Sequence, residues 1–324
     1  MAIKKTKNSF LFLLLLISFE PMAWAGMLSG TIDSSLLPQD KAVRLTIYQG
    51  SGRTSVKSVA VKQNRCRWSY AVKALKAGKY RLQIESQDGT GVYYRKSINI
   101  GQQAISINIP ARRILRVGST RKYKKPSDAA RVARAADVIE IDAGVYYADA
   151  TVWWKPNIVI RGVGGRAHIV AQGAHAEGKA VWVIKGDNTR VENIEVSGAR
   201  VPDRNGAAIR QEGANLTLCN VYMHDNENGL LGGGGTVLVE YSEFARNGFG
   251  KGQTHNIYIV NTEKFILRYS YSHHAKIGHN VKSRAKNNYI LYNLIMDGRE
   301  GQSSYGIDIP EGGHTYIVGN IVQQ

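Results

Sequence analysis

The chain has 324 residues, with 43 lysines and arginines against 25 aspartates and glutamates, and a formal net charge of +18. This excess favours anionic partners, namely an acidic glycan, nucleic acid or an anionic membrane surface, unless the charge only solvates the surface. The two cysteines, Cys66 and Cys219, exclude a disulfide framework and lack the spacing of a zinc site. Because they fall in different predicted domains, we expect two isolated buried thiols.

Residues 1–25 have the parts of a secretory signal peptide. Three lysines precede an apolar run at 10–17, and Ala23 and Ala25 are the small residues that a signal peptidase requires. The run is shorter than the roughly 20 residues of a membrane span, and no second long run follows. Gly26 after the predicted cut offers no thiol for a lipid anchor. We therefore expect a mature chain of charge +16, periplasmic or secreted, that does not span a membrane.

Residues 26–110 are predicted to form a first, small β domain. Apolar residues alternate with polar ones at 43–48, 80–84 and 105–109, which places one apolar face of each strand inward. Turn residues separate these segments, as is typical of a β-sandwich. The segment Gly78-Lys79-Tyr80-Arg81-Leu82 resembles a strand of immunoglobulin-like and prealbumin-like modules. No catalytic constellation is visible here, so we expect a spacer or a binding module.

A basic linker is predicted at 111–125, where seven lysines and arginines gather. A helix follows at 129–136, which Ser127 or Asp128 can cap. A strand at 138–141 then ends at the turn 144–146.

The remainder of the chain contains an internal repeat. Six apolar-rich segments share a column of turn residues with steps of 27, 21, 28, 24 and 27 residues, namely Asn193, Asn220, Tyr241, Tyr269, Asn293 and Asn320. This is about the length of one coil of a parallel β-helix, which buries a core only by stacking such coils. Asparagine suits the position because it tolerates a left-handed backbone and its amides can hydrogen-bond along the stack.

On these features, 115–324 resembles right-handed parallel β-helix proteins of the pectate-lyase-like group. The resemblance implies an all-β protein in which a short helix caps the first coil, and we place the β-helix domain at 126–324. The last repeat segment ends at Gln324 with no visible cap, so we expect either a truncated chain or a paired end.

A second column of the repeat has the residue types of an active site. Aligning the apolar residues of the strands at 208–211, 255–259, 279–283 and 305–309 predicts a stack that points outward, namely Arg210, Tyr258, Lys282 and Asp308. A parallel stack lies two residues before the apolar position, namely His255, His279 and Tyr305. Rungs about 4.8 Å apart would bring these side chains into one groove.

A third cluster follows the first column, at the turn after each segment. There His224 and His273 share one position, and Asp297 is predicted to take it in the next coil. Asp225 and His274 lie beside them.

Together these residues suggest proton transfer on a sugar acid. Lys282 or Tyr258 would remove the proton beside a uronate carboxylate, His255 or His279 would handle the second proton, and Arg210 would neutralise the carboxylate. We expect the remaining polar residues to bind substrate, namely Asp308, His273, His274, His224 and Tyr305. This chemistry is β-elimination by a polysaccharide lyase. The alternative is a polar surface ladder that only stabilises turns.

The segment Val281-Lys282-Ser283, with Asn288 and Tyr292-Asn293 after it, resembles the lysine-bearing rung of β-helix lyases that act on chondroitin, dermatan and alginate. That resemblance implies a lysine base, an arginine on a following coil and upstream acidic calcium ligands. Only the lysine matches, because Ala275, Lys276 and Ile277 stand where the acidic residues belong and Asp308 stands on the next coil. We therefore expect no metal and no cofactor, since a calcium-assisted mechanism lacks its ligands. The His-rich turns could also hold a transition metal, but nothing in the sequence fixes the ligand count.

Other functions remain open on the same fold. A glycoside hydrolase needs paired carboxylates, for which Asp297, Asp308 and Glu311 are candidates without an adjacent pair. A uronate epimerase shares the proton abstraction. A non-catalytic glycan-binding or matrix protein would stack sugars on Tyr146, Tyr147, Trp153, Trp154 and Trp182. Nucleic acid is not the expected partner, since no motif for it is visible. We expect a monomer that binds an acidic polysaccharide.

Overall fold

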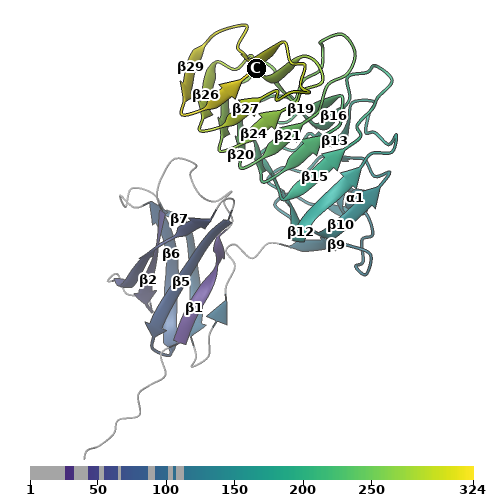
Figure 1. Ribbon diagram of the computed structural model, residues 1–324. Helices are drawn as coiled ribbons and strands as arrows, with labels where there is room; N and C mark the ends of the chain where they lie inside the picture. The colour runs from purple at the N-terminus through teal and green to yellow at the C-terminus, as the bar shows by residue number, and fades with distance from the viewer. Residues whose placement is uncertain are drawn as a thin grey trace, which may run out of the picture.

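The computed structural model describes residues 26–32, 43–50, 55–64, 67–86, 92–100, 105–106 and 113–324 (Figure 1). The predicted signal peptide lies outside these residues. Among the helices of the described chain, none has the length and apolarity of a membrane span.

The N-terminal part contains two four-stranded sheets. One has the strand order β4 (Lys62–Asn64), β5 (Arg67–Leu75), β1 (Gly26–Ile32), β8 (Ile105–Ser106), and the other β3 (Ser55–Ala60), β2 (Val43–Gln49), β6 (Gly78–Ser86), β7 (Val92–Ile100). Leu28 and Val72 of the first sheet and Leu45 and Leu82 of the second belong to one buried core. The period-two alternation produces this burial, because every second side chain faces inward. An immunoglobulin-like or prealbumin-like topology stays a prediction.

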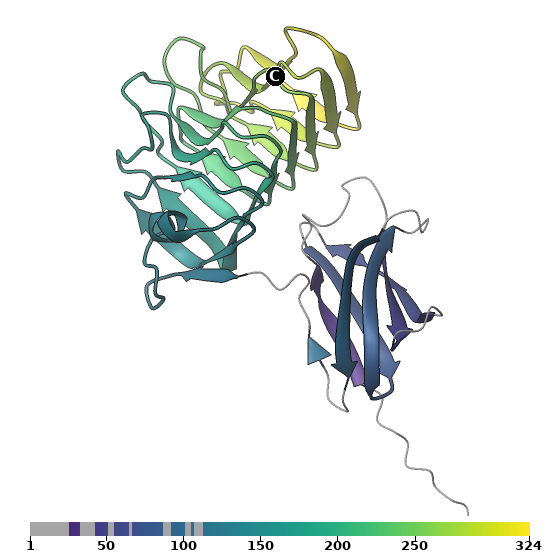
Figure 2. The ribbon, with the colours of Figure 1, turned by 180° about the vertical axis from the view of Figure 1, so that it is seen from behind.

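The rest of the chain is a solenoid of parallel strands, and all of its strand pairs are parallel (Figures 1 and 2). Two ladders of the solenoid join in one 15-stranded sheet. The long strands β10 (Val138–Tyr147) and β12 (Val159–Val170) begin both ladders, and β9 (Ile114–Val117) pairs with β10.

The first ladder continues through β14 (Thr189–Glu192), β17 (Leu216–Cys219), β20 (Thr236–Glu240), β23 (Lys264–Arg268), β26 (Asn287–Leu291) and β29 (His314–Val318). The second ladder continues through β15 (Ile194–Ser197), β18 (Tyr222–His224), β21 (Glu243–Ala245), β24 (Tyr271–His273), β27 (Leu294–Met296) and β30 (Ile321–Gln323). The third ladder is a separate sheet of β11 (Thr151–Trp153), β13 (Ala180–Ile184), β16 (Ala207–Gln211), β19 (Asn228–Gly232), β22 (Ile257–Ile259), β25 (His279–Ser283) and β28 (Tyr305–Asp308).

The inward side chains of the three ladders form one core. It contains buried residues of every ladder, such as Phe265 of the first, Phe244 of the second and Val281 of the third. Each such side chain contributes roughly 1.5–3 kcal/mol when it leaves water. The short helix α1 (Pro126–Val132) packs on β9 and β11 and buries Ala129 in the same core. A parallel β-helix is therefore confirmed as the fold, and a helix lies over its first coil as the resemblance implied.

The column of turn residues is confirmed in its first four members and wrong by one residue after them. Positive φ angles place Asn193, Asn220, Tyr241 and Tyr269 in the left-handed region, but the next member is Tyr292 rather than Asn293. Asn293 and Asn320 instead follow the turn and bond to each other at 2.9 Å. The predicted amide stacking occurs, since Asn220 Nδ2 also donates to Asn193 Oδ1 at 3.0 Å.

A second, buried amide ladder runs inside the solenoid and was not predicted. Asn226, Asn247, Asn256 and Asn280 are fully buried, and each amide bonds to the next. Each Nδ2 also donates a second hydrogen bond, to a backbone carbonyl in the first three asparagines and to Asp297 in the last. These asparagines satisfy backbone groups at the turn between the second and third ladders, where the strands do not.

Four local predictions need correction. The basic linker at 111–125 contains β9, which belongs to the sheet because residues 114–117 pair with β10. The helix ends at Val132 rather than at residue 136, because the backbone of Ala133 is already extended. The turn predicted at 144–146 is a bulge within β10, at a register shift between Asp142 and Gly144. Cys219 is disulfide-bonded and not an isolated thiol, whereas Cys66 lies outside the described residues.

Candidate functional site

Three consecutive rungs of the third ladder bring four of the five predicted catalytic residues together. Strand pairing sets Tyr258, Lys282 and Asp308 in direct register on β22, β25 and β28. Their neighbours Ile257 and Val281 are fully buried, so the polar side chains point away from the core. We call this set, together with His255, His279 and Arg284, the polar cluster.

Asp308 connects the members of the polar cluster. Its Oδ2 atom lies 3.3 Å from Lys282 Nζ and 3.1 Å from His279 Nε2. The Lys282 ammonium also lies 5.5 Å from the centre of the Tyr258 ring. The lysine is thus held between a carboxylate and an aromatic ring, and its side chain is 17% exposed.

The two histidines form the buried layer of the polar cluster. Their rings stack at 4.9 Å, and the backbone N–H of His279 donates to His255 Nδ1 at 3.0 Å. Tyr305, which is paired with His279 on the next strand, packs its ring against His279 with the ring centres 5.3 Å apart. Burial, with His279 and Lys282 nearby, lowers the pKa of His255 to about 3, and burial also lowers that of His279 although Asp308 opposes it. Both imidazoles are therefore neutral near pH 7, and His255 is only 2% exposed.

Arg210 does not join the polar cluster, contrary to prediction. Arg210 pairs with Leu231, and Leu231 in turn pairs with Tyr258, so a whole rung separates the arginine from the tyrosine. The predicted column of repeat strands left out β19, because Leu231 at this position has no ionisable or polar side chain. Arg210 instead lies 3.6 Å from Glu212.

Arg284, and not Arg210, places a guanidinium group in the polar cluster. Its Nε donates to the Tyr258 hydroxyl oxygen at 3.1 Å, and its Nη1 pairs with Glu311. Both bonds raise the pKa of Arg284, and the bond to Glu311 has the larger effect. Arg284 follows β25 two residues after Lys282, on the same side of the chain. Continuing the period-two pattern past the strand end was the signal that could have found it.

The predicted histidine turn cluster lies on another sheet, in the second ladder. His224 and His273 do share one column, but Ala245 separates them. Asp297 is not in that column, since Met296 pairs with His273. Each histidine stacks on the tyrosine two residues before it, at 4.2 Å on β18 and 3.8 Å on β24. These residues do not share the groove of Lys282 because they face outward from a different side of the coil.

His274 lies beside His273, with their Nδ1 atoms 2.5 Å apart. His273 also pairs with Glu243 at 3.2 Å, and burial lowers its pKa. These two histidines thus form a local pair at the turn after β24, as predicted from their adjacency.

The carboxylates proposed for a hydrolase are all engaged. Asp297 is buried and accepts hydrogen bonds from Asn280 and from Ser303. Asp308 and Glu311 are paired with cations of the polar cluster. The polar cluster therefore contains two cations, and each of them is held in place by its own carboxylate.

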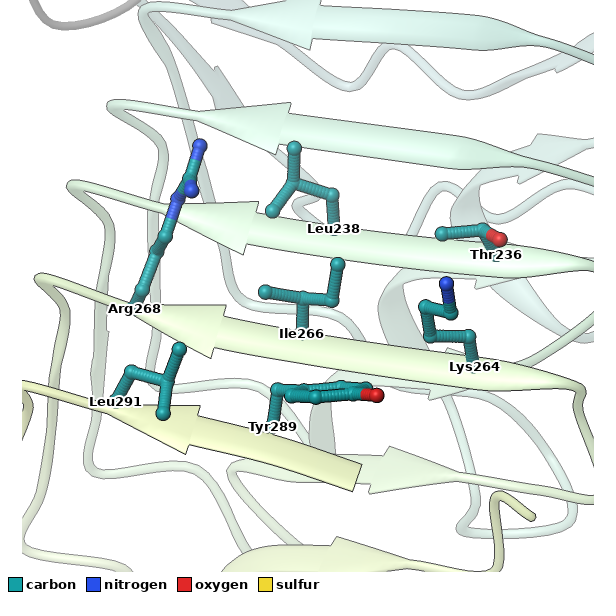
Figure 3. Close-up of a pocket in the computed structure, with 7 residues that line it drawn as sticks. All are labelled: Thr236, Leu238, Lys264, Ile266, Arg268, Tyr289 and Leu291. Atoms are coloured by element: carbon teal, nitrogen blue, oxygen red, sulfur yellow. The ribbon is translucent and has the colours of Figure 1, made fainter. Parts of the chain in front are cut away.

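A shallow groove crosses the outer face of the first ladder, away from the polar cluster. Its volume is about 360 Å³. Figure 3 shows one column of Leu238, Ile266 and Tyr289 in the groove, with Lys264 on one side of it and Arg268 on the other. Arg268 is held by Glu240 at 2.8 Å, and Tyr289 stacks on Tyr316 at 5.1 Å. The groove thus combines an aromatic ring with two cations.

The chain is a parallel β-helix protein, as its three ladders of parallel strands define. No family model and no curated protein matches it. Among solved structures it is similar to a pectin methylesterase from Aspergillus niger, with a TM-score of 0.40 and 10% identity over 65% of this chain and 85% of that one. It is also similar to a family 28 exopolygalacturonase from Yersinia enterocolitica, with a TM-score of 0.31 and 11% identity over 89% and 82%. At these TM-scores the fold assignment rests on the strand pairing itself.

Proposed function

We propose that this protein is an exported lyase that cleaves an acidic, uronate-containing polysaccharide by β-elimination. The observation that carries the proposal is the register of Tyr258, Lys282 and Asp308 on three rungs, with Arg284 bonded to the tyrosine. A metal-free elimination needs a cation for the carboxylate and a group that moves protons, and this cluster offers both.

Lys282 and Arg284 are the groups that bind the uronate carboxylate. Both stand beside Tyr258, one over its ring and one on its hydroxyl. An ammonium paired with a carboxylate is a donor without a lone pair, so we assign Lys282 to the carboxylate and not to the base. Pairing the uronate carboxylate with two cations stabilises the negative charge that develops when the adjacent C–H bond breaks.

Tyr258 is the group that moves the protons. Its oxygen accepts a hydrogen bond from Arg284 Nε at 3.1 Å, which places a cation beside the reacting atom. In the proposed step the tyrosyl oxygen, acting as a phenolate, removes the proton beside the carboxylate, the electron pair forms the carbon–carbon double bond, and the neighbouring glycosidic C–O bond breaks. The leaving oxygen takes its proton from the same phenol, which regenerates the phenolate. His255 and His279 are positioning residues, because both lie buried behind Asp308 and Lys282.

Export agrees with three features. The N-terminus has the pattern of a signal peptide. Cys219 is disulfide-bonded, and disulfides persist in oxidising compartments. The net charge of +18 suits a soluble acidic polymer.

The test is an incubation of the purified mature chain with pectate, alginate, glycosaminoglycans and bacterial exopolysaccharides, followed by ultraviolet absorbance of the unsaturated uronate. We expect a rise that resists chelators and falls at least about 100-fold in Tyr258→Phe and Lys282→Ala. Lys286→Ala is the matched control, since this exposed lysine pairs with Glu263 at 3.2 Å and should change little. New reducing ends without the absorbance would indicate a hydrolase, and solvent hydrogen exchange without cleavage an epimerase.

A second candidate is a non-catalytic glycan-binding protein, which the groove of the first ladder favours. Tyr289 offers a ring for sugar stacking, and Lys264 and Arg268 offer charges for carboxylates. Retention on the same polymers without any cleavage, weakened by salt and by Lys264→Ala, would support this function. In that case Lys282→Ala would leave retention unchanged.

A further inference from the structure

Three potential metal ligands meet on the outward face of the second ladder. His168 of β12 and Glu195 of β15 are paired in register, and His224 of β18 lies one strand further on the same face. One ligand atom of each residue lies within 4.8 Å of the others. All three are half-buried, so the site is both accessible to an ion and partly shielded from water.

The distances match those around a small metal ion. His168 Nδ1 lies 3.3 Å and His224 Nε2 lies 3.1 Å from the same oxygen, Oε1 of Glu195. Ligand atoms that share one tetrahedral zinc at bonds of about 2.0–2.2 Å are about 3.3–3.6 Å apart. The side chains thus already stand close to ligating distance without rearrangement of the strands.

The other nitrogen of each ring is engaged by a second partner. His224 Nδ1 lies 2.8 Å from an Asp225 oxygen, and His168 Nε2 lies 2.8 Å from Ser197 Oγ. Arg246 Nη2 is 3.4 Å from His224 Nδ1, but its nearer partner is the same aspartate at 3.0 Å. Metal-binding histidines typically donate their second N–H to a carboxylate or a similar acceptor, which fixes the tautomer.

This arrangement turns two nitrogens toward one carboxylate oxygen. When His224 donates from Nδ1 to Asp225, its Nε2 presents a lone pair to Glu195, and a neutral His168 bonded to Ser197 through Nε2–H does the same with Nδ1. A shared cation satisfies all three acceptors at once.

We propose that His168, Glu195 and His224 bind one divalent transition-metal ion of the zinc class. Two imidazoles and one carboxylate leave a fourth position for water or a ligand oxygen. The site is on a different sheet from the polar cluster, so it does not depend on the proposed lyase activity.

The chain offers an internal comparison two rungs along the same ladder. There the pattern Tyr271-x-His273 with Glu243 repeats Tyr222-x-His224 with Glu195. The residue paired before Glu243 is Tyr222, whereas the residue paired before Glu195 is His168. The second location lacks this histidine ligand, so His273 serves as a matched control.

The test uses the full mature chain, purified without a histidine tag and stripped with chelator. Titration with Zn²⁺ by calorimetry should show about one ion per chain, and Co²⁺ should give the visible absorption of a four-coordinate nitrogen and oxygen site. Glu195→Gln, which keeps the side-chain shape, and His224→Ala should abolish both signals, while His273→Ala keeps them. Asp225→Asn should weaken affinity roughly 10–100-fold.

The proposal is overturned when the wild-type chain binds no ion. It is equally overturned when Glu195→Gln keeps full affinity, or when His273→Ala loses as much affinity as His224→Ala. Circular dichroism of each variant shows that its strands are intact. A His224→Ala chain that fails to fold leaves the decision to Glu195→Gln, which removes only the carboxylate charge.

Discussion

Replacing Asn256 with alanine removes the middle of the buried amide ladder inside the solenoid. Asn256 Oδ1 accepts from the backbone N–H and from Nδ2 of Asn247, at 3.1 and 2.8 Å. Its Nδ2 donates to Asn280 Oδ1 at 2.8 Å and to the carbonyl of His273 at 2.9 Å. The side chain is fully buried, so water cannot replace these bonds in the alanine variant.

The cost follows from the groups left without a partner. The Asn247 N–H and the Asn280 Oδ1 lose their bonds, whereas the His273 carbonyl still accepts from the backbone of Arg246. Each unsatisfied buried group costs about 1–3 kcal/mol, so the free energy of unfolding should fall by about 2–6 kcal/mol. That is a large part of the roughly 5–15 kcal/mol that stabilises a typical domain.

Urea unfolding followed by circular dichroism measures this loss. Asn287→Ala is the control, because its amide bonds to Glu263 at the surface and should cost about 0.5 kcal/mol or less. A loss below about 1 kcal/mol for Asn256→Ala would refute the reasoning, since the ladder would then not satisfy buried groups.

Two further predictions concern His255 and Gly278, the residue before His279. The pKa of His255 is lowered from 6.5 to about 3, so the unfolded chain binds more protons than the folded one between these values. The free energy of unfolding should therefore fall as the pH drops through this window, by up to roughly 1.4 kcal/mol per pH unit. In His255→Gln the urea midpoint should depend less steeply on pH than in wild type. Equal pH dependence in the two chains would contradict the prediction. Gly278→Ala adds a Cβ 2.0 Å from the Thr254 carbonyl at φ +74° and should cost about 1–3 kcal/mol. Its melting temperature should fall below that of Gly250→Ala, which has a positive φ but open space, and equal values would exclude the clash.

The solenoid could be predicted because its coils repeat the same local physics. Inward apolar residues alternate along each strand, and a left-handed turn residue marks each coil from Asn193 to Tyr269. The register failed after Tyr269, because Tyr292 takes the turn and Asn293 follows it. Tyrosine has no intrinsic preference for the left-handed region, so the sequence does not mark Tyr292 as the turn residue. In the structure its ring stacks on that of Tyr269 at 5.7 Å. The neighbouring Asn293, which suits a left-handed turn better, was therefore predicted in its place.

The polar cluster could be predicted only in part. Tyr258, Lys282 and Asp308 share a column that the strand pattern reveals, and the pairing confirms their register. Arg210 was placed beside them because the β19 rung, with Leu231 in the column, has no chemically distinctive residue. Arg284 lies one residue past the end of its strand, so only a period-two pattern continued beyond Ser283 would have indicated it.

The sequence does not reveal the proposed metal site for a different reason. Glu195 lies 27 residues after His168 and His224 lies 29 residues after Glu195, and only the strand pairing brings the three together. The sequence singles out His224 for its similarity to His273, but at His273 the position that corresponds to His168 is occupied by Tyr222. The disulfide bond of Cys219 was also beyond prediction, since position in the sequence does not determine whether a thiol lies within bonding distance of another.

The measurement that tests the central claim most directly is the ultraviolet assay with the polysaccharide panel, comparing wild type, Tyr258→Phe and Lys286→Ala in the presence of chelator. The account predicts that wild type and Lys286→Ala generate the unsaturated product on a uronate polymer at similar rates, and that Tyr258→Phe does not. Equal rates in wild type and Tyr258→Phe would contradict the assignment of the polar cluster as a lyase site. Binding of a polymer by the wild-type chain without unsaturated product from any polymer of the panel would contradict it as well.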